Sequence, residues 1–498
     1  MNKHFTDKQS EYLFLFIILC CASFLFLMNL NNHYLWQDEA ETALVGKTIL
    51  KHGIPLGYDG KNFFSQVEGK DHDENYVWKF HPWFQNYLVA ASFKIFGINT
   101  FSARLPFAMF GIATVLLIYF FSKSLWKDRR TAVIATILLL LSVPFLILSR
   151  QCRYYAPATF FALFGLYSYL NIIDRKKYAG LMFVLSSILL FHTLFPFCLN
   201  LLATVSVHSL LWHRNRARTV LLLCFGIIII NAPWIIWISD IKYGGRNSIS
   251  QVLLFAILFL LQIGKYIFSP IILSVPLLVG VLNWRKSKKF FSKDKVMWKN
   301  LSLLLLFIMF NLLSFTLKSP FPLFRYLAPL IPIFCLMSAL ILESAMKLHL
   351  ALGIGILSIL ILTSPIYDYF YEITHDYEGP IEGIVKYLNE NGSKNDVVAI
   401  TYGDLPLKFY TNMRIIGGLT GEDLSPAKEA DWIIIRKHII GTKDLRVRKY
   451  LIRNVSWNNY QRIIIDYPDI AFENRENPDH KYRTVINENR VVIYRKIR

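Results

Sequence analysis

The strongest chemical signal in the sequence is a pair of adjacent acids, Asp38 and Glu39, in WQDEAETALVGKTILKHGIPLGYDG at 36–60. Helix-like sequence follows the pair until HGIP at 52–55 ends it. Adjacent residues of a helix point to different faces, so we expect only one of the two acids to face a given ligand. An acid close to a membrane is costly and usually functional. The alternative is that Asp38 only caps the following helix, and the two roles can coexist.

The segment that follows combines further acids with a histidine among aromatic rings. Glu68 begins the run EGKDHDEN, and His81 lies among Trp78, Phe80, Trp83 and Tyr87. Acids, a histidine and stacked rings together describe a carbohydrate site, whereas aromatic residues alone also form a belt at a membrane interface. Three of the acids are more simply explained as a solvated loop tip, namely Asp71, Asp73 and Glu74.

Two other loops place cations between apolar runs. SRQCRYYAP (149–157) contains Arg150, Arg153 and Tyr154, and KSPFPLFRYLAP (318–329) contains Lys318, Arg325 and Tyr326. Arginine pairs bidentately with phosphate oxygens and lysine acts as a point charge, although snorkelling to lipid headgroups is the alternative. Such cations would hold the phosphate of a lipid-linked sugar as the leaving group. A carboxylate would deprotonate the acceptor hydroxyl or help hold a divalent metal.

The composition identifies the elements that must position these residues as membrane helices. Among 498 residues, 54% are apolar and only 18% are charged, which excludes a soluble enzyme, a disordered chain and a fibrous protein. We expect a mostly α, polytopic helix bundle of about eleven spans. The expected spans are 11–30, 106–122, 131–149, 155–173, 179–195, 197–212, 219–238, 266–283, 300–317, 327–344 and 350–366. Two shorter apolar segments are expected not to cross, 82–97 as an interfacial helix and 251–264 as a flat or re-entrant one.

The net charge of +20 is explained by topology and not by nucleic-acid binding. Lysine and arginine concentrate in four segments, which the positive-inside rule places in the cytoplasm together with the N-terminus. Residues 31–103 then form an external loop, and the C-terminus is external too. The four basic segments are 123–130, 174–177, 213–218 and 284–299. The six cysteines form neither a disulfide framework nor a metal pair.

The composition changes after residue 366. We therefore divide the chain into a membrane domain at 1–366, which includes the external loop, and a small external α/β domain at 367–498. Helix-like stretches at 381–391 and 443–453 alternate there with short β-rich runs. The β-rich runs are 396–402, 431–436, 462–467 and 490–495.

The order of these motifs along the chain resembles one group of enzymes. The acid pair, WKFHPW at 78–83, FGINTFSARLPFAMFG at 96–111, the basic turn at 127–130, SRQCRYYAP and FRYLAPLIP follow one another as in the family 39/83-type glycosyltransferases of the GT-C superfamily. That group is related to the protein O-mannosyltransferases and the lipid A aminoarabinose transferases. The resemblance covers about residues 11–345, and the C-terminal domain is the variable part of such enzymes.

The resemblance implies an inverting transferase of the cytoplasmic (inner) membrane. It would use a polyprenyl-phosphate sugar and a lipid, glycan or protein acceptor, with no organic cofactor. It assigns the catalytic acid to Asp38, with Glu39 beside it, and Glu68 to a metal or the acceptor. A divalent metal would be held by Asp38 and Glu68. His81 is followed by Pro82-Trp83 where many relatives have Pro-Pro, which leaves its role open. The phosphate would be bound by the basic outer-loop positions, Arg150, Arg153, Lys318 and Arg325.

Two other functions compete with this one. A flippase or transporter of lipid-linked saccharides needs charged residues along a path through the bundle, but four expected spans contain almost none away from their ends. A scaffold would explain 380–498 but not the acid pair. The sequence does not name the sugar, the acceptor or the oligomeric state.

Overall fold

The computed structural model describes residues 7–238, 247–269, 272, 295–418, 420–437, 442–470 and 489–497. The chain divides into two compact units. We call Met1–Met28 with Phe107–Tyr369 the helical unit, and Asn29–Pro106 with Phe370–Arg498 the α/β unit. The long loop and the C-terminal segment, which the sequence analysis assigned to different domains, thus belong to one compact unit.

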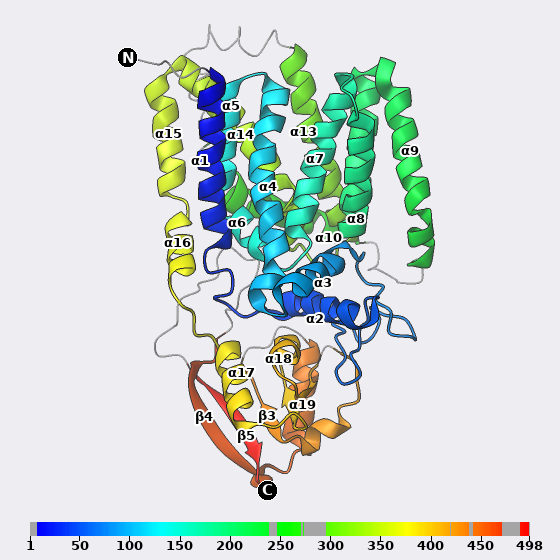
Figure 1. Ribbon diagram of the computed structural model, residues 1–498, viewed down its shortest axis with the longest axis vertical. Coiled ribbons are helices and arrows are strands. Elements are labelled where there is room, and N and C mark those ends of the chain that lie inside the picture. Colours follow the sequence, from blue (N-terminus) through cyan, green and yellow to red (C-terminus); the bar gives the residue numbers. More distant parts are fainter. Residues whose placement is uncertain are drawn as a thin grey trace. The chain divides into compact units, whose positions relative to one another are not determined.

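The helical unit consists of apolar helices (Figure 1). Eight of the described helices are long and apolar enough to cross a membrane, or up to ten if each of two bent pairs is one span. The multi-pass bundle is therefore confirmed, but the count of about eleven spans is not. The elements are α1 (Asp7–Leu27), most of α4 (Thr100–Trp126), α5 (Arg129–Leu140), α6 (Val143–Arg150), α7 (Tyr155–Ile173), α8 (Ala179–Trp212), α9 (Arg214–Trp237), α10 (Ile249–Gln262), η1 (Ile263–Ile267), α13 (Lys295–Lys318), η2 (Phe324–Leu327), α14 (Leu330–Leu348), α15 (Leu350–Leu362) and part of α16 (Ile366–Thr374).

Helix α8 consists of two arms that fold back on each other. Its backbone leaves the helical region at Leu194 (φ −154°, ψ 103°), just before Pro196, a residue that disrupts the preceding turn. The Cys198 thiol lies 3.2 Å from the carbonyl oxygen of Ser187, although eleven residues of straight helix would separate them by roughly 16 Å. The two arms correspond to the separate apolar segments that the sequence predicts before and after Pro196.

One predicted arrangement, with 251–264 flat or re-entrant and 266–283 crossing, stays a prediction. The segment expected to lie flat, 251–264, belongs to the continuous apolar helix Ile249–Ile267, whose 19 residues are enough to span a membrane. Of the span expected at 266–283, everything after residue 269 except Ile272 lies outside the described residues, as do the first eleven positions of the basic segment 284–299.

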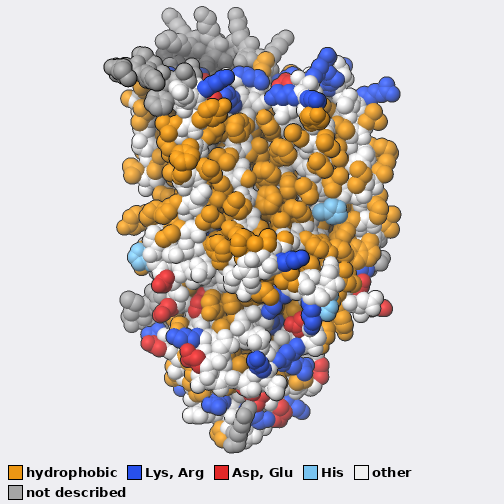
Figure 2. Space-filling model, viewed as in Figure 1, with side chains coloured by type: hydrophobic (Ala, Val, Ile, Leu, Met, Phe, Trp, Pro, Cys, Tyr) orange, Lys and Arg blue, Asp and Glu red, His pale blue; other side chains and the backbone are white. Residues whose placement is uncertain are grey.

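The basic segments gather at one end of the helical unit. Lys127 lies 3.8 Å from Asp174, which joins the first basic segment to the second. His208 links the other two basic segments. It donates from Nε2 to the carbonyl of Lys299, the last residue of the fourth segment (2.9 Å), and its ring lies 5.5 Å from that of His213, the first residue of the third segment. Figure 2 shows Lys and Arg side chains gathered at one end of this unit and hydrophobic side chains covering its flank.

The α/β unit contains a five-stranded sheet in the order β2-β1-β3-β5-β4. Strands β2 and β3 both pair with β1 in parallel, and β5 pairs antiparallel with β3 and β4. The strands are β1 (Val397–Ile400), β2 (Arg414–Ile416), β3 (Trp432–Ile434), β4 (Tyr460–Pro468) and β5 (Arg490–Lys496). The helices are α2 (Gln37–His52), α3 (Phe84–Phe96), α17 (Pro380–Asn391), α18 (Asp404–Tyr410), α19 (Thr442–Asn454), η3 (Ser425–Glu429) and η4 (Trp457–Asn459).

Apolar side chains cover both faces of this sheet. Side chains alternate between the faces of a strand, so Val398 packs in the cluster that contains Leu388 of α17, whereas Ala399 packs in the cluster that contains Leu451 of α19. The predicted helices and four of the strands are therefore present, and the three-residue strand β2 was not predicted.

Candidate functional site

Asp38 lies in the first turn of α2, one residue after Gln37, which begins the helix. Trp36 is the N-cap (φ −80°, ψ 175°), so Asp38 is the second helical residue and the interpretation of Asp38 as the cap is wrong. Asp38 is buried, with 9% of the residue exposed. A carboxylate in this position is stabilised by the positive end of the helix dipole. The helix ends at Gly53 (φ 78°), as HGIP predicted.

Glu39 forms a buried, two-pronged ion pair with Arg104. The guanidinium donates from Nε to Oε1 (2.8 Å) and from Nη2 to Oε2 (2.7 Å), and the two side chains are 0% and 3% exposed. Arg104 also donates to the carbonyls of Leu30 (3.0 Å), His33 (2.7 Å) and Tyr34 (3.1 Å). The adjacent acids therefore have different surroundings, and Glu39 fixes the turn that leads into α2.

Arg104 was missed by the sequence analysis, although a signal for it existed. It lies in FGINTFSARLPFAMFG, beside a loop expected to be external and therefore poor in Lys and Arg. The same rule drew attention to Arg150 and would have drawn attention to Arg104.

The acids of the loop after α2 have very different degrees of burial. Asp71 is 1% exposed and accepts from the backbone N–H of Gln66 (3.0 Å), so its assignment to a solvated tip is wrong. Burial raises the pKa of this carboxyl. Glu68 adopts a left-handed backbone (φ 60°) and lies 3.8 Å from Arg446. Glu41, which lies within α2, accepts from the side-chain amide of the loop residue Gln66.

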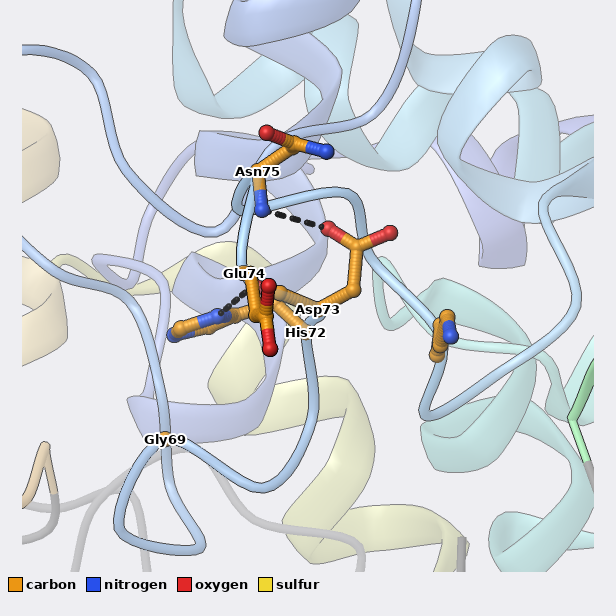
Figure 3. A pocket seen from close by; sticks show the side chains of 6 residues that line it. Gly69, His72, Asp73, Glu74 and Asn75 are labelled. Carbon is orange, nitrogen blue, oxygen red and sulfur yellow. Dashed lines mark hydrogen bonds between the residues drawn. The ribbon is translucent and has the colours of Figure 1, made fainter. Parts of the chain in front are cut away.

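A shallow hollow of about 540 Å³ lies at the tip of this loop (Figure 3). Asp73 shapes it by accepting from the backbone N–H groups of Asn75 (3.0 Å) and Val77 (2.8 Å). The partly exposed ring of Tyr76 lies 5.4 Å from that of His72. The lining residues are Gly69, His72, Asp73, Glu74, Asn75 and Lys79. Asp73 and Glu74 thus line a hollow, and neither Asp38 nor Glu68 belongs to its lining.

Along the chain, His81 lies between Lys79, which lines this hollow, and the start of helix α3 at Phe84. It is half-buried, and its ring is 4.4 Å from that of Phe80. The neighbouring indole of Trp83 donates to the carbonyl of Trp78 (2.8 Å), which fixes the segment that carries the histidine. The role of His81 toward a substrate stays a prediction.

In the helical unit, Arg150 closes the end of helix α1. Its Nη1 donates to the carbonyls of Leu25 (3.1 Å), Phe26 (3.1 Å) and Met28 (2.8 Å). The last carbonyls of a helix need such donors. The hydroxyl of Tyr369 donates to the carbonyl of Leu25 as well (2.7 Å). These contacts give Arg150 a structural role, and its predicted phosphate contact stays a prediction.

The other predicted cations lie on two segments. Arg153 is buried, and its guanidinium lies 5.6 Å from the ring of Tyr154. Lys318 is exposed at the end of α13, and Arg325 and Tyr326 belong to η2. Within the helical unit, the ring of Tyr326 is stacked on the ring of Phe315, with 4.6 Å between the ring centroids.

Both cationic segments lie at the end of the helical unit opposite the basic segments. Glu11 of α1 pairs with Lys123 at 2.6 Å, so the other end of α1, which Arg150 closes, is remote from the basic segments. Asn300 donates to the carbonyl of Leu125 (2.5 Å), so α13 starts at the basic end and Lys318 ends it at the other. The predicted phosphate-binding residues therefore share one end of this unit.

The described residues contain no group of three or more His, Cys, Asp or Glu side chains that could hold a metal ion. Asp38 and Glu68 thus lack a third protein ligand of this kind within the described ranges. The divalent metal stays a prediction.

The C-terminal segment holds the loop that carries the acids. Gln37 donates to Asp404 (2.7 Å), and the backbone N–H of Leu35 donates to the hydroxyl of Tyr410 (2.9 Å). Burial raises the pKa of Tyr410, so the phenol stays protonated. Asn62 donates to the carbonyl of Met413 (3.1 Å) and accepts from the N–H of Ile415 (2.8 Å), along the edge strand β2.

Residues 80–237 match the family described as dolichyl-phosphate-mannose-protein mannosyltransferase. The undecaprenyl phosphate-alpha-4-amino-4-deoxy-L-arabinose arabinosyl transferase of Yersinia pestis (strain Pestoides F) is 28% identical over 138 residues, 27% of this chain and 21% of that one. An uncharacterized protein of Aquifex aeolicus (strain VF5) is 26% identical over 162 residues, 32% of this chain and 30% of that one. The matches thus span less than a third of the length of these curated relatives.

Solved structures match over nearly the whole chain. ArnT from Cupriavidus metallidurans bound to undecaprenyl phosphate gives a TM-score of 0.57 at 12% identity and covers 98% of both chains. The oligosaccharyltransferase AglB from Archaeoglobus fulgidus, in complex with an inhibitory peptide and a dolichol-phosphate, gives 0.53 at 13% identity and covers 86% of this chain and 69% of that one. The fold is that of the GT-C glycosyltransferase superfamily. The sequence matches, which cover a third of the chain or less, are to the protein mannosyltransferases and to an arabinosyl transferase.

Proposed function

We propose that this chain is a glycosyltransferase that moves a sugar from a polyprenyl-phosphate donor to an acceptor at the external face of the cytoplasmic membrane. The observation that carries the proposal is the placement of Asp38, which lies in a buried first helical turn directly before the ion-paired Glu39. The shared fold with ArnT, whose structure contains undecaprenyl phosphate, supports the kind of donor.

The reaction needs one base and one anion-binding group. The acceptor, a hydroxyl group of a lipid, glycan or protein, attacks the anomeric carbon while Asp38 takes its proton. The bond between that carbon and the phosphate oxygen breaks, and its electron pair leaves with the lipid phosphate, so the anomeric configuration inverts. Arg153, Lys318 and Arg325 stabilise the departing phosphate. Glu68 and His81 contact the acceptor.

The orientation of the chain follows from the basic end of the helical unit. The positive-inside rule places that end, together with the N-terminus, in the cytoplasm. Loop 31–103 and the C-terminus are then external. An impermeant thiol reagent applied to intact cells should label Asp466→Cys and leave Arg216→Cys at the level of the unsubstituted chain. Labelling of Arg216→Cys but not of Asp466→Cys would show that the proposed topology is inverted.

The catalytic role is tested by Asp38→Asn. We expect transfer to fall by about 10²–10⁴-fold because the base is lost, while the thermal stability changes little. The measurement is the transfer of labelled sugar from a polyprenyl-phosphate donor by the purified protein. The matched control is Asp466→Asn, an acid of the same unit that is 91% exposed. Near-normal turnover in Asp38→Asn would end the case for this base.

A further inference from the structure

Gln37 precedes Asp38 and has an unusual environment for an amide side chain. It is only 3% exposed. Its Nε2 donates to Oδ1 of Asp404 at 2.7 Å, across 367 residues of sequence. The first residue of α2 is therefore held by the helix that follows strand β1.

The carboxylate of Asp404, which accepts from Gln37, is fixed by an ion pair with Lys408. Asp404 accepts from Nζ of Lys408 at 2.8 Å, and the same ammonium donates to the carbonyl of Phe63 at 2.9 Å. The side chains of Asp404 and Lys408 are 3% and 0% exposed. Charges buried this deeply hold a single arrangement, because separating them would leave each without a partner.

This arrangement fixes which way the amide of Gln37 faces. A carboxylate only accepts hydrogen bonds, so the NH₂ group of Gln37 must face Asp404 and Oε1 must face away. That oxygen is buried and has no hydrogen-bond partner among the residues that the structure describes. Buried acceptors without a partner are rare in folded proteins, so an oxygen of this kind, one residue before the proposed base in the sequence, calls for a donor other than the residues that the structure describes.

We propose that Gln37 is a substrate-binding residue whose amide oxygen accepts a hydrogen bond from a hydroxyl group of the saccharide substrate. Asp404 and Lys408 are positioning residues that act through it. The inference rests on the proposed transferase function and extends it to a residue outside the acid pair. A neutral amide oxygen suits this task because it accepts a hydrogen bond from a hydroxyl without taking its proton. Because adjacent helical residues point to different faces, Gln37 would contact a different part of the saccharide from Asp38.

The direct test replaces the amide by an apolar group of similar size. In Gln37→Leu we expect kcat/KM to fall by about tenfold, the loss of one hydrogen bond to a substrate. Rates are measured against donor and acceptor concentration separately, and the substrate whose KM rises is the one that provides the hydroxyl. Unchanged kinetics in a folded Gln37→Leu protein would overturn the proposal.

The positioning role is tested by a double-mutant cycle. Asp404→Asn combined with Lys408→Met removes both charges without leaving either one unpaired, and the amide of Gln37 becomes free to turn. We expect this pair of changes to lower kcat/KM several-fold in the normal chain and to have no further effect on kcat/KM in Gln37→Leu. Equal losses in both backgrounds would show that the ion pair acts on stability and not through Gln37.

A second buried ion pair in the same unit provides the matched control. Arg436 donates from Nε to Oδ1 of Asp469 at 2.7 Å, and the two side chains are 0% and 3% exposed. Arg436→Met combined with Asp469→Asn should lower the melting temperature but leave both KM values unchanged. A KM change of the size seen for the Asp404 and Lys408 variant would refute the positioning role. Failure of the underlying function would show itself differently, because the unsubstituted chain would then transfer no sugar.

Discussion

Buried charge is used differently in the two units. In the α/β unit, carboxylate and cation are matched inside the protein: Glu39 with Arg104, which are 65 residues apart, and Asp404 with Lys408 on one helix. In the helical unit, Arg150 gathers three backbone carbonyls at the end of α1. The ion pairs position the segments around the proposed base, whereas Arg150 completes a helix end. Removing a partner should therefore have different costs in the two units.

The largest effect is expected for Arg104→Met. It leaves the carboxylate of Glu39 buried without its cation, which costs on the order of 3–5 kcal/mol. Thermal unfolding of the purified protein measures the loss. Adding Glu39→Gln removes the unpaired charge and should restore part of the stability. A change within about 0.5 kcal/mol for Arg104→Met alone would mean that the pair is as weak as an exposed one.

Arg150→Met should destabilise the protein less, by about 1.5–3 kcal/mol, because the three carbonyls to which Arg150 donates are neutral. Arg150→Lys should recover only part of the loss, since an ammonium replaces the fork of donors. The same variants distinguish the two roles of this residue. If Arg150 binds the donor phosphate instead, the KM for the donor rises and the melting temperature stays constant.

Arg153→Ala and Arg325→Ala should each weaken donor use about ten- to a hundredfold, as expected when a charged hydrogen bond to phosphate is lost. Lysine at either position should rescue only partly, because it lacks the bidentate fork. Arg216→Ala, at the basic end of the same unit, is the control and should behave as the unsubstituted chain. The measurement is the transfer rate against donor concentration, and unchanged donor dependence in both alanine variants would remove the phosphate site.

The smallest effect concerns Asp71 and pH. Because burial raises its pKa in the folded protein, the folded state favours the protonated carboxyl. Asp71 then contributes stability below about pH 4, near its unfolded pKa, and that contribution is lost as the pH rises through its folded pKa. Asp71→Asn should accordingly raise the melting temperature at pH 7, with a difference that shrinks toward pH 4. A constant difference across this range would contradict the shift, and Asp466→Asn is the exposed control.

The fold was largely predictable because it depends on patterns within short segments of the sequence. Apolar runs of membrane length gave the bundle, and the change of composition after residue 366 gave the sheet. Strand β2 was missed because three residues, Arg414–Ile416, are too few to show a period. Charge counting alone does not decide whether helix Ile249–Ile267 or the segment after it crosses, because this helix is also long and apolar enough to span a membrane.

The site was less predictable because its contacts connect residues far apart in the chain. The acid pair was found from its position after the first apolar run, but the sequence did not tell which acid would be ion-paired. That distinction depends on Arg104, and the environment of Gln37 depends on Asp404, 367 residues away. No period or spacing in a single sequence encodes such pairings.

The hydrogen bonds of Asn62 along β2 have a consequence for how the protein is made. An exposed edge strand invites pairing with other chains, and Asn62 occupies the backbone groups of Met413 and Ile415 on this one. Segment 29–106 leaves the ribosome tens of seconds before the strand that it protects, at ordinary rates of synthesis. Asn62 therefore cannot form these hydrogen bonds until strand β2 has been synthesised. The C-terminal segment made on its own would expose that edge. Biogenesis of this protein is thus expected to include a late assembly step, and the interval before it is when the chain is most prone to aggregate.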